Sequence, residues 1–180
     1  MTLPDRFATA MPIAEFIDQA KSNKDLWIAV SRRAEAPSEL VERLQALPER
    51  RHLLVLAEDW CADALGTLPP LARLVEQVPQ LELRVLSRDE NLDVMDAHLT
   101  GGKRAIPVVI VLDENLEECA WWGSRPAALQ RWVASPEAQR LTKEERYKEI
   151  RRWYSTDRGR TALGEIATLV QSCAALNDAA

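Results

Sequence analysis

The chain switches repeatedly between two hydrophobic periods, and this alternation restricts its fold more than any other feature. Residues 52–57 and 107–112 are short, almost uninterrupted apolar segments, which are typical of strands covered on both faces. Residues 81–86 alternate apolar and polar side chains and predict a third strand, and residues 116–122 predict a fourth. A short turn separates the last two strands along the chain, so they should pair antiparallel.

Helical patterns separate and follow these strands. Apolar side chains recur at helical spacing in residues 12–20, 38–47, 62–77, 89–99 and 124–134. Residues 24–33 fit either a helix or a short strand, and we favour the helix. Pro69 and Pro70 predict a kink or break in their helix, and residues 136–176 predict two more helices with a break near 155–159. This order predicts an α/β domain, with a small central sheet between two layers of helices.

Composition excludes several classes of protein. The 180 residues carry 23 basic and 28 acidic side chains, a formal net charge of −5, which argues against nucleic acid as a partner. No apolar segment is long enough for a membrane helix, and residues 1–20 lack the pattern of a signal peptide. We therefore expect no membrane partner and a cytoplasmic location.

The cysteines and histidines do not form a metal-binding pattern. The three cysteines, Cys61, Cys119 and Cys173, are widely spaced, and there are two histidines, so we expect no zinc site and no metal. In a reducing cytoplasm the cysteines should remain thiols. Cys119 and Cys173 are expected to be packing residues of the interior.

Cys61 differs from the other cysteines in its position along the chain. It directly follows a predicted buried strand and directly precedes a predicted helix. A thiol at a helix N-terminus meets unsatisfied N–H groups and the positive end of the helix dipole, and both favour the thiolate. Pro107 stands at the first residue of another buried strand, where a proline does not interrupt the ladder.

These residues carry a resemblance to a known superfamily. The chain reads Trp60-Cys61-Ala62-Asp63-Ala64 after one strand, Ile106-Pro107 before the next, and Trp122-Gly123-Ser124 before a helix. In this order they resemble the thioredoxin superfamily, in which a strand leads into Trp-Cys-x-x-Cys and a cis-proline follows. The resemblance covers about residues 38–134, and it is strongest to an uncharacterised bacterial branch of the superfamily.

The resemblance implies a thioredoxin-like fold and a site. The expected fold is a central mixed sheet with helices on both faces, an N-terminal helix and a C-terminal helical extension. We interpret residues 1–180 as a single domain, with a core at about 38–134 and extensions at 1–36 and 135–180. The resemblance makes Cys61 the candidate catalytic residue, gives Pro107 a cis bond, and assigns substrate contacts to Trp60, Ala62, Asp63, Ala64, Ile106 and Pro107.

Two departures from the family pattern bear on function. Ala64 stands where the resolving cysteine is expected, and Val55 stands where many members keep a buried carboxylate on the central strand. Without a resolving cysteine the chain cannot release a mixed disulfide by itself, so it is not an ordinary dithiol thioredoxin. We expect a monothiol thiol–disulfide exchange protein acting on protein or peptide thiols and disulfides. It would need no bound cofactor, but an external thiol such as glutathione.

The charges around Cys61 predict weak activation. Asp63 lies two residues into the helix, and at about 6 to 7 Å and a dielectric of about 20 to 80 it repels a thiolate by roughly 0.6 to 2.5 kcal/mol. The positive end of the helix dipole stabilises the thiolate by roughly 0.3 to 1 kcal/mol. Glu58 and Asp59 add negative potential. We therefore expect a pKa close to that of an ordinary thiol.

Two other functions are compatible with the same residues. The chain could instead be a redox-inert module that binds a peptide or protein in a groove between Trp60 and Pro107. A weaker alternative has Cys61 ligating an iron–sulfur cluster together with an external thiol. Residues 140–160 are locally basic, which is typical of a solvated helix face and, less often, of a surface for an anionic partner.

Overall fold

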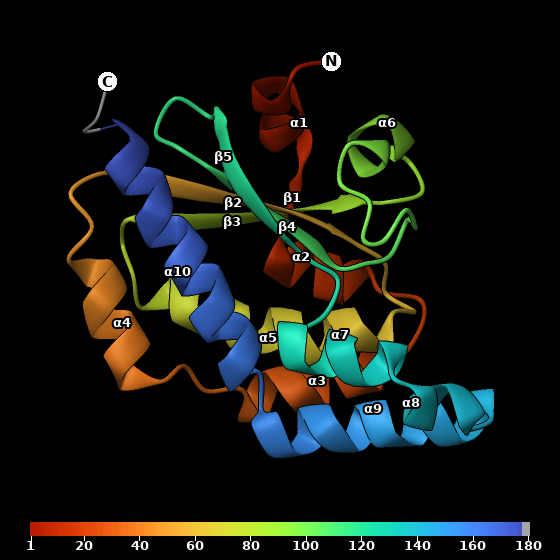
Figure 1. Cartoon of the computed structure of the whole chain (residues 1–180). Coiled ribbons are helices and arrows are strands. Elements are labelled where there is room, and N and C mark those ends of the chain that lie inside the picture. The colour runs from red at the N-terminus through yellow and green to blue at the C-terminus, as the bar shows by residue number, and fades with distance from the viewer. Residues whose placement is uncertain (178–180) are drawn as a thin grey trace.

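The structure, a computed structural model, describes the backbone of residues 1–177. A five-stranded mixed sheet forms its centre, in the order β1-β3-β2-β4-β5 (Figure 1). Strand β2 pairs parallel with β3, and the other neighbours pair antiparallel. The strands are β1 (Met11–Pro12), β2 (Arg51–Ala57), β3 (Leu81–Ser87), β4 (Val108–Leu112) and β5 (Glu118–Gly123).

The hydrophobic pattern explains which strands are central. Every side chain of β4 is buried, as are the last five of β2, so both strands need cover on both faces. Strand β3 keeps Glu82 and Arg84 half-exposed between buried neighbours. Burial therefore follows the periods read from the sequence.

Helices lie on both sides of the sheet. In Figure 1, α1 and α6 lie on one side and α2, α3, α5 and α10 lie on the other. Adjacent residues of β5 show the two layers, since Trp122 donates to Glu165 of α10 while Trp121 packs edge-on against His98, just after α6. The helices are α1 (Leu3–Thr9), α2 (Ile13–Gln19), α3 (Lys24–Arg33), α4 (Ser38–Gln45), α5 (Ala62–Glu76), α6 (Leu92–Asp96), α7 (Ala127–Ala134), α8 (Pro136–Arg140), α9 (Lys143–Asp157) and α10 (Arg160–Asn177).

The predicted architecture is confirmed, and several local predictions need correction. The ambiguous segment 24–33 is helical, and α5 continues through Pro69 and Pro70 instead of breaking. The helix predicted for 89–99 shortens to α6, because the Asn91 side chain donates back to the carbonyl of Ser87 and holds a turn before it. Helices α1 and α8 and strand β1 were not expected, so three helices follow residue 135 instead of two.

Cys119 and Cys173 form a disulfide, with Cα atoms 5.3 Å apart. The expectation that these two cysteines are separate packing thiols is therefore wrong. The bond joins β5 to α10 across 54 residues of sequence, a pairing that spacing alone cannot reveal. No helix within the described residues is long and apolar enough to span a membrane.

Candidate functional site

Strand register brings the predicted site residues to one end of the sheet. Leu56 near the end of β2 pairs with Val108 at the start of β4, and Val108 pairs with Gly123 at the end of β5. The segments that continue from these three strand ends therefore meet. They carry Cys61, the Ile106–Pro107 pair and Arg125.

Cys61 is the N-cap residue of α5. Its Sγ accepts a hydrogen bond from the backbone N–H of Ala64 at 3.5 Å and donates to the carbonyl of Ile106 at 3.4 Å. The Ile106–Pro107 peptide bond is cis. The thiol thus lies between the first turn of a helix and the backbone that precedes the cis-proline.

Burial dominates the chemistry of this thiol. Only 7% of Cys61 is exposed, and its pKa is raised to about 11, mainly by desolvation and also by the Asp63 carboxylate. The N–H groups of Ala64 and Asp63 and the Arg125 guanidinium act in the opposite direction. The expected near-ordinary pKa is therefore too low, because the depth at which the thiol is buried cannot be read from a motif.

Asp63 is paired, contrary to the isolated charge assumed above. Its carboxylate receives two hydrogen bonds from Arg125, at 2.9 Å from Nε and 2.5 Å from a terminal nitrogen. Asp63 is 6% exposed, and burial raises its pKa while Arg125 counteracts that rise. Sequence reasoning missed Arg125, and the only signal for it was a cation directly after the Trp122-Gly123-Ser124 segment.

The two other acids near the thiol have structural roles. Glu58 accepts hydrogen bonds from the Ser87 hydroxyl and the N–H of Asp89, both at 2.9 Å. Asp59 accepts from the N–H groups of Lys21 and Ser22, at 2.7 and 2.8 Å. These carboxylates tie β3 and the N-terminal segment to the loop before Cys61, so they are not free charges directed at the thiol.

The remaining predicted contact residues lie around Cys61 but differ in access. Ala64, Ile106 and Pro107 are buried and Ala62 is half-buried. Trp60 is 49% exposed, and the guanidinium of Arg88 lies 5.1 Å from the centre of its ring. The residues cluster as expected, yet the thiol is covered and Trp60 is the accessible surface beside it.

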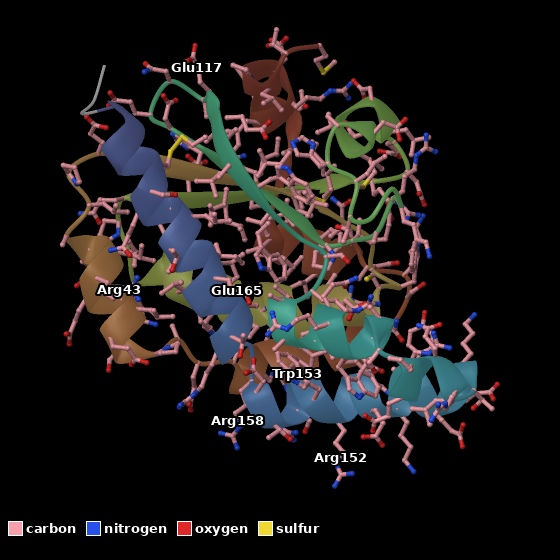
Figure 2. The ribbon with its side chains drawn as sticks, in the orientation of Figure 1. Arg43, Glu117, Arg152, Trp153, Arg158 and Glu165 are labelled. Atoms are coloured by element: carbon pink, nitrogen blue, oxygen red, sulfur yellow. A yellow bond between two sulfur atoms is a disulfide. The ribbon has the colours of Figure 1, made fainter. Side chains whose placement is uncertain are left out.

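The C-terminal helices close one side of the site. Tyr154 of α9 packs so tightly on α5 that a Cβ built at Gly66 would lie 2.4 Å from its ring. Glu165 of α10, labelled in Figure 2, accepts hydrogen bonds from the Trp122 side chain at 2.7 Å and from the N–H of Ala127 at 2.9 Å. The opposite side of α9 is solvated, with Arg152 and Arg158 pointing outward (Figure 2).

The site has one sulfur and no set of metal ligands. Ala64 provides no second thiol, and the described residues contain no group of three or more histidine, cysteine or acidic side chains that could hold a metal. What the arrangement offers chemically is one protected thiol, beside a backbone carbonyl and a buried ion pair.

Comparison with known proteins gives a family but no function. A family model described as thioredoxin matches residues 10–156. A protein of unknown function from Pseudomonas aeruginosa, PA1234, is 24% identical over 96% of this chain and 98% of its own, with a TM-score of 0.76. An HIV 4E10 epitope-scaffold is 23% identical over 96% and 99%, also with a TM-score of 0.76. None of the curated proteins matches.

Proposed function

Because this chain belongs to the thioredoxin family, we propose that it is a monothiol thiol–disulfide exchange protein that uses Cys61. One observation carries the proposal: the Cys61 sulfur lies at the N-terminus of α5, 3.4 Å from the carbonyl that precedes the cis-proline. An extended substrate would lie against the backbone of Ile106 and Pro107, with Trp60, Ala62, Asp63 and Ala64 forming the rest of the contact. The proposed partners are proteins or peptides with thiols or disulfides, rather than nucleic acid or membranes.

The proposed exchange needs an external thiol and no bound cofactor. The Cys61 thiolate attacks the glutathione sulfur of a glutathionylated substrate, so a Cys61–glutathione disulfide forms and the substrate leaves as a thiolate. A second glutathione thiolate then attacks this disulfide, which returns Cys61 as thiolate and releases oxidised glutathione. Each cycle therefore consumes one reduced glutathione, and the glutathione that the substrate carried leaves as the other half of the oxidised glutathione. Ala64 explains why the second thiol must come from outside.

The burial of the thiol sets a condition on this proposal. With a pKa of about 11, little of Cys61 is thiolate at neutral pH, so exchange is slow unless substrate binding exposes the sulfur or brings a positive charge to it. This same observation favours a second candidate, a redox-inert module that binds a peptide. Its contact surface would be Trp60, with Arg88 over the ring.

Intact-mass measurements with oxidised glutathione separate the two candidates. Since Cys119 and Cys173 are bonded to each other, Cys61 is the free thiol. Exchange predicts one glutathione adduct on the wild type, none on Cys61→Ala, and removal of the adduct by reduced glutathione. No adduct on the native wild type, together with peptide binding unchanged in Cys61→Ala, would favour the inert module.

Ala64→Cys provides a gain-of-function variant. It restores the second cysteine of the pair at a position whose N–H already reaches the Cys61 sulfur. After glutathionylation this variant should expel glutathione by forming an intramolecular disulfide, whereas the wild type should keep its adduct. A stable adduct on both proteins would argue against the proposed geometry.

We place the protein in the cytoplasm as part of this proposal, because the external thiol it needs is abundant there. The Cys119–Cys173 bond speaks against a strongly reducing compartment. Rapid alkylation of thiols in intact cells, followed by peptide mass analysis, tests the location. Fully alkylated Cys119 and Cys173 would support the cytoplasm, and an intact bond would place the protein in an oxidising compartment.

A further inference from the structure

A buried ion pair next to the thiol has no part in a simple exchange mechanism. Asp63 and Arg125 form two parallel hydrogen bonds, at 2.9 and 2.5 Å, and their side chains are 8% and 18% exposed. Burying a charged pair costs free energy that a well-packed apolar pair would not. The Asp63–Arg125 pair therefore either holds the segment after β5 against α5 or controls the charge near Cys61.

The position of each charge relative to Cys61 supports control of charge. Asp63 is two residues beyond the thiol in the first turn of α5, so on its own it opposes formation of a thiolate. Arg125 follows the end of β5 and acts on the same thiol in the opposite direction. Held together, the two charges oppose each other at the Cys61 sulfur, with the effect of Asp63 the larger.

The C-terminal extension shields the Asp63–Arg125 pair from solvent. Tyr154 of α9 packs against Gly66, one turn along α5 from Asp63. Burial and then the nearby Asp63 carboxylate raise the pKa of Tyr154. The Tyr154 hydroxyl lies beside the Asp63 carboxylate and the Thr67 hydroxyl, and both groups act on its pKa. The ring thus acts as a cover that lowers the local dielectric, which strengthens every charge effect at this end of α5.

We propose that Arg125 is a positioning residue for Cys61, which neutralises Asp63 beneath the cover of Tyr154 and thereby sets the reactivity of the thiol. The inference deepens the proposed function and rests on it for its biological meaning. The charged or titratable groups that act on Cys61 here are Asp63 and Arg125, with Tyr154 behind them on α9. The C-terminal extension then belongs to the site and is more than an accessory to the fold.

The experiment is a double-mutant cycle read by alkylation of Cys61. Asp63→Asn removes the negative charge and leaves Arg125 unopposed, so the rate with iodoacetamide at about pH 8 should rise about 2- to 10-fold. Arg125→Gln should lower the rate, because the Asp63 carboxylate is then left unopposed. The double variant should fall between the two, and Arg125→Lys, which keeps the charge, should stay within about twofold of the wild type.

A purely structural ion pair would not change the Cys61 alkylation rate in opposite directions in the two single variants. If the pair only fastens the segment between β5 and α7 to α5, either single variant loosens the site and both alkylate faster, which would overturn the proposal. Thermal unfolding of every variant separates loosening from charge effects. If Arg125→Gln does not fold, Arg125→Lys still separates the two explanations: an unchanged rate supports control of charge, and a faster rate indicates loss of a structural contact.

Alkylation reports on the thiol whether or not the protein exchanges disulfides. A failed glutathione experiment with the expected signs would therefore refute the proposed function and leave the role of Arg125 intact. Successful glutathionylation with equal signs would do the reverse.

Discussion

Replacing Gly66 by alanine tests whether α9 packs closely against α5 beside the site. A Cβ at this position would lie 2.4 Å from Cδ1 and 2.5 Å from Cγ of Tyr154. These atoms form the base of the ring, so Tyr154 cannot avoid the clash by moving the far end of its side chain. Either α9 shifts away from α5 or Tyr154 leaves its rotamer.

Two opposing contributions decide the size of the effect. Alanine is better than glycine inside a helix by about 1 kcal/mol, whereas inserting an atom into packed space costs about 1 to 3 kcal/mol. Gly164→Ala in α10 is the matched control, because a Cβ there meets nothing within 4 Å. The control should gain about 1 kcal/mol, and the difference between the variants, from which helix propensity cancels, should be about 1 to 3 kcal/mol.

Urea unfolding followed by circular dichroism measures both variants, with the slope confirming that the same surface is exposed. In a Tyr154→Ala background the clash is gone, so Gly66→Ala should become as favourable as Gly164→Ala. If Gly66→Ala stabilises the otherwise unchanged protein as much as the control does, the close packing of α9 on α5 is refuted.

Three further predictions concern sulfur and histidine chemistry. Replacing both Cys119 and Cys173 by serine should lower the unfolding free energy by up to about 4 kcal/mol, since the bond closes a loop across 54 residues; an unchanged urea midpoint would contradict this. The rate of Cys61 alkylation should rise with pH, with the midpoint of the rise at about pH 11. A midpoint below about 9 would show that the thiol is not desolvated. Burial lowers the pKa of His98, but its contacts with Glu118 and a backbone carbonyl outweigh this and leave it raised. The stabilisation from His98 is then complete below about pH 6.5 and is lost as pH rises through the raised pKa. The wild type should therefore exceed His98→Gln in stability by more at about pH 5.5 than at about pH 8.5, and an equal difference at both would contradict the assignment.

The sequence predicted the parts of this fold that depend on hydrophobic period. Residues 52–57 and 107–112 read as buried strands because both faces of β2 and β4 are covered. The Cys61 and Pro107 positions followed from those strand ends. Strand β1 could not be found in this way, since a two-residue strand has no period to detect.

Contacts between distant segments could not be predicted from the same patterns. Arg125 is an ordinary cation in the sequence, and its partner became evident only when the end of β5 was placed beside α5. The Cys119–Cys173 bond likewise depends on α10 crossing β5. The pKa of Cys61 depends on burial, which is a property of the assembled layers and not of the motif.

The short strand β1 covers an edge of the sheet to which a strand from another molecule could otherwise be added. Its two residues, Met11 and Pro12, pair with Val85 and Arg84 and occupy the free side of β3. Unpaired strand sides are templates on which another chain can add a strand, and such additions lead to aggregates. Pro12 has no N–H to offer an incoming strand, so the ladder stops there. A strand of only two residues thus protects the sheet against the addition of further strands along this edge.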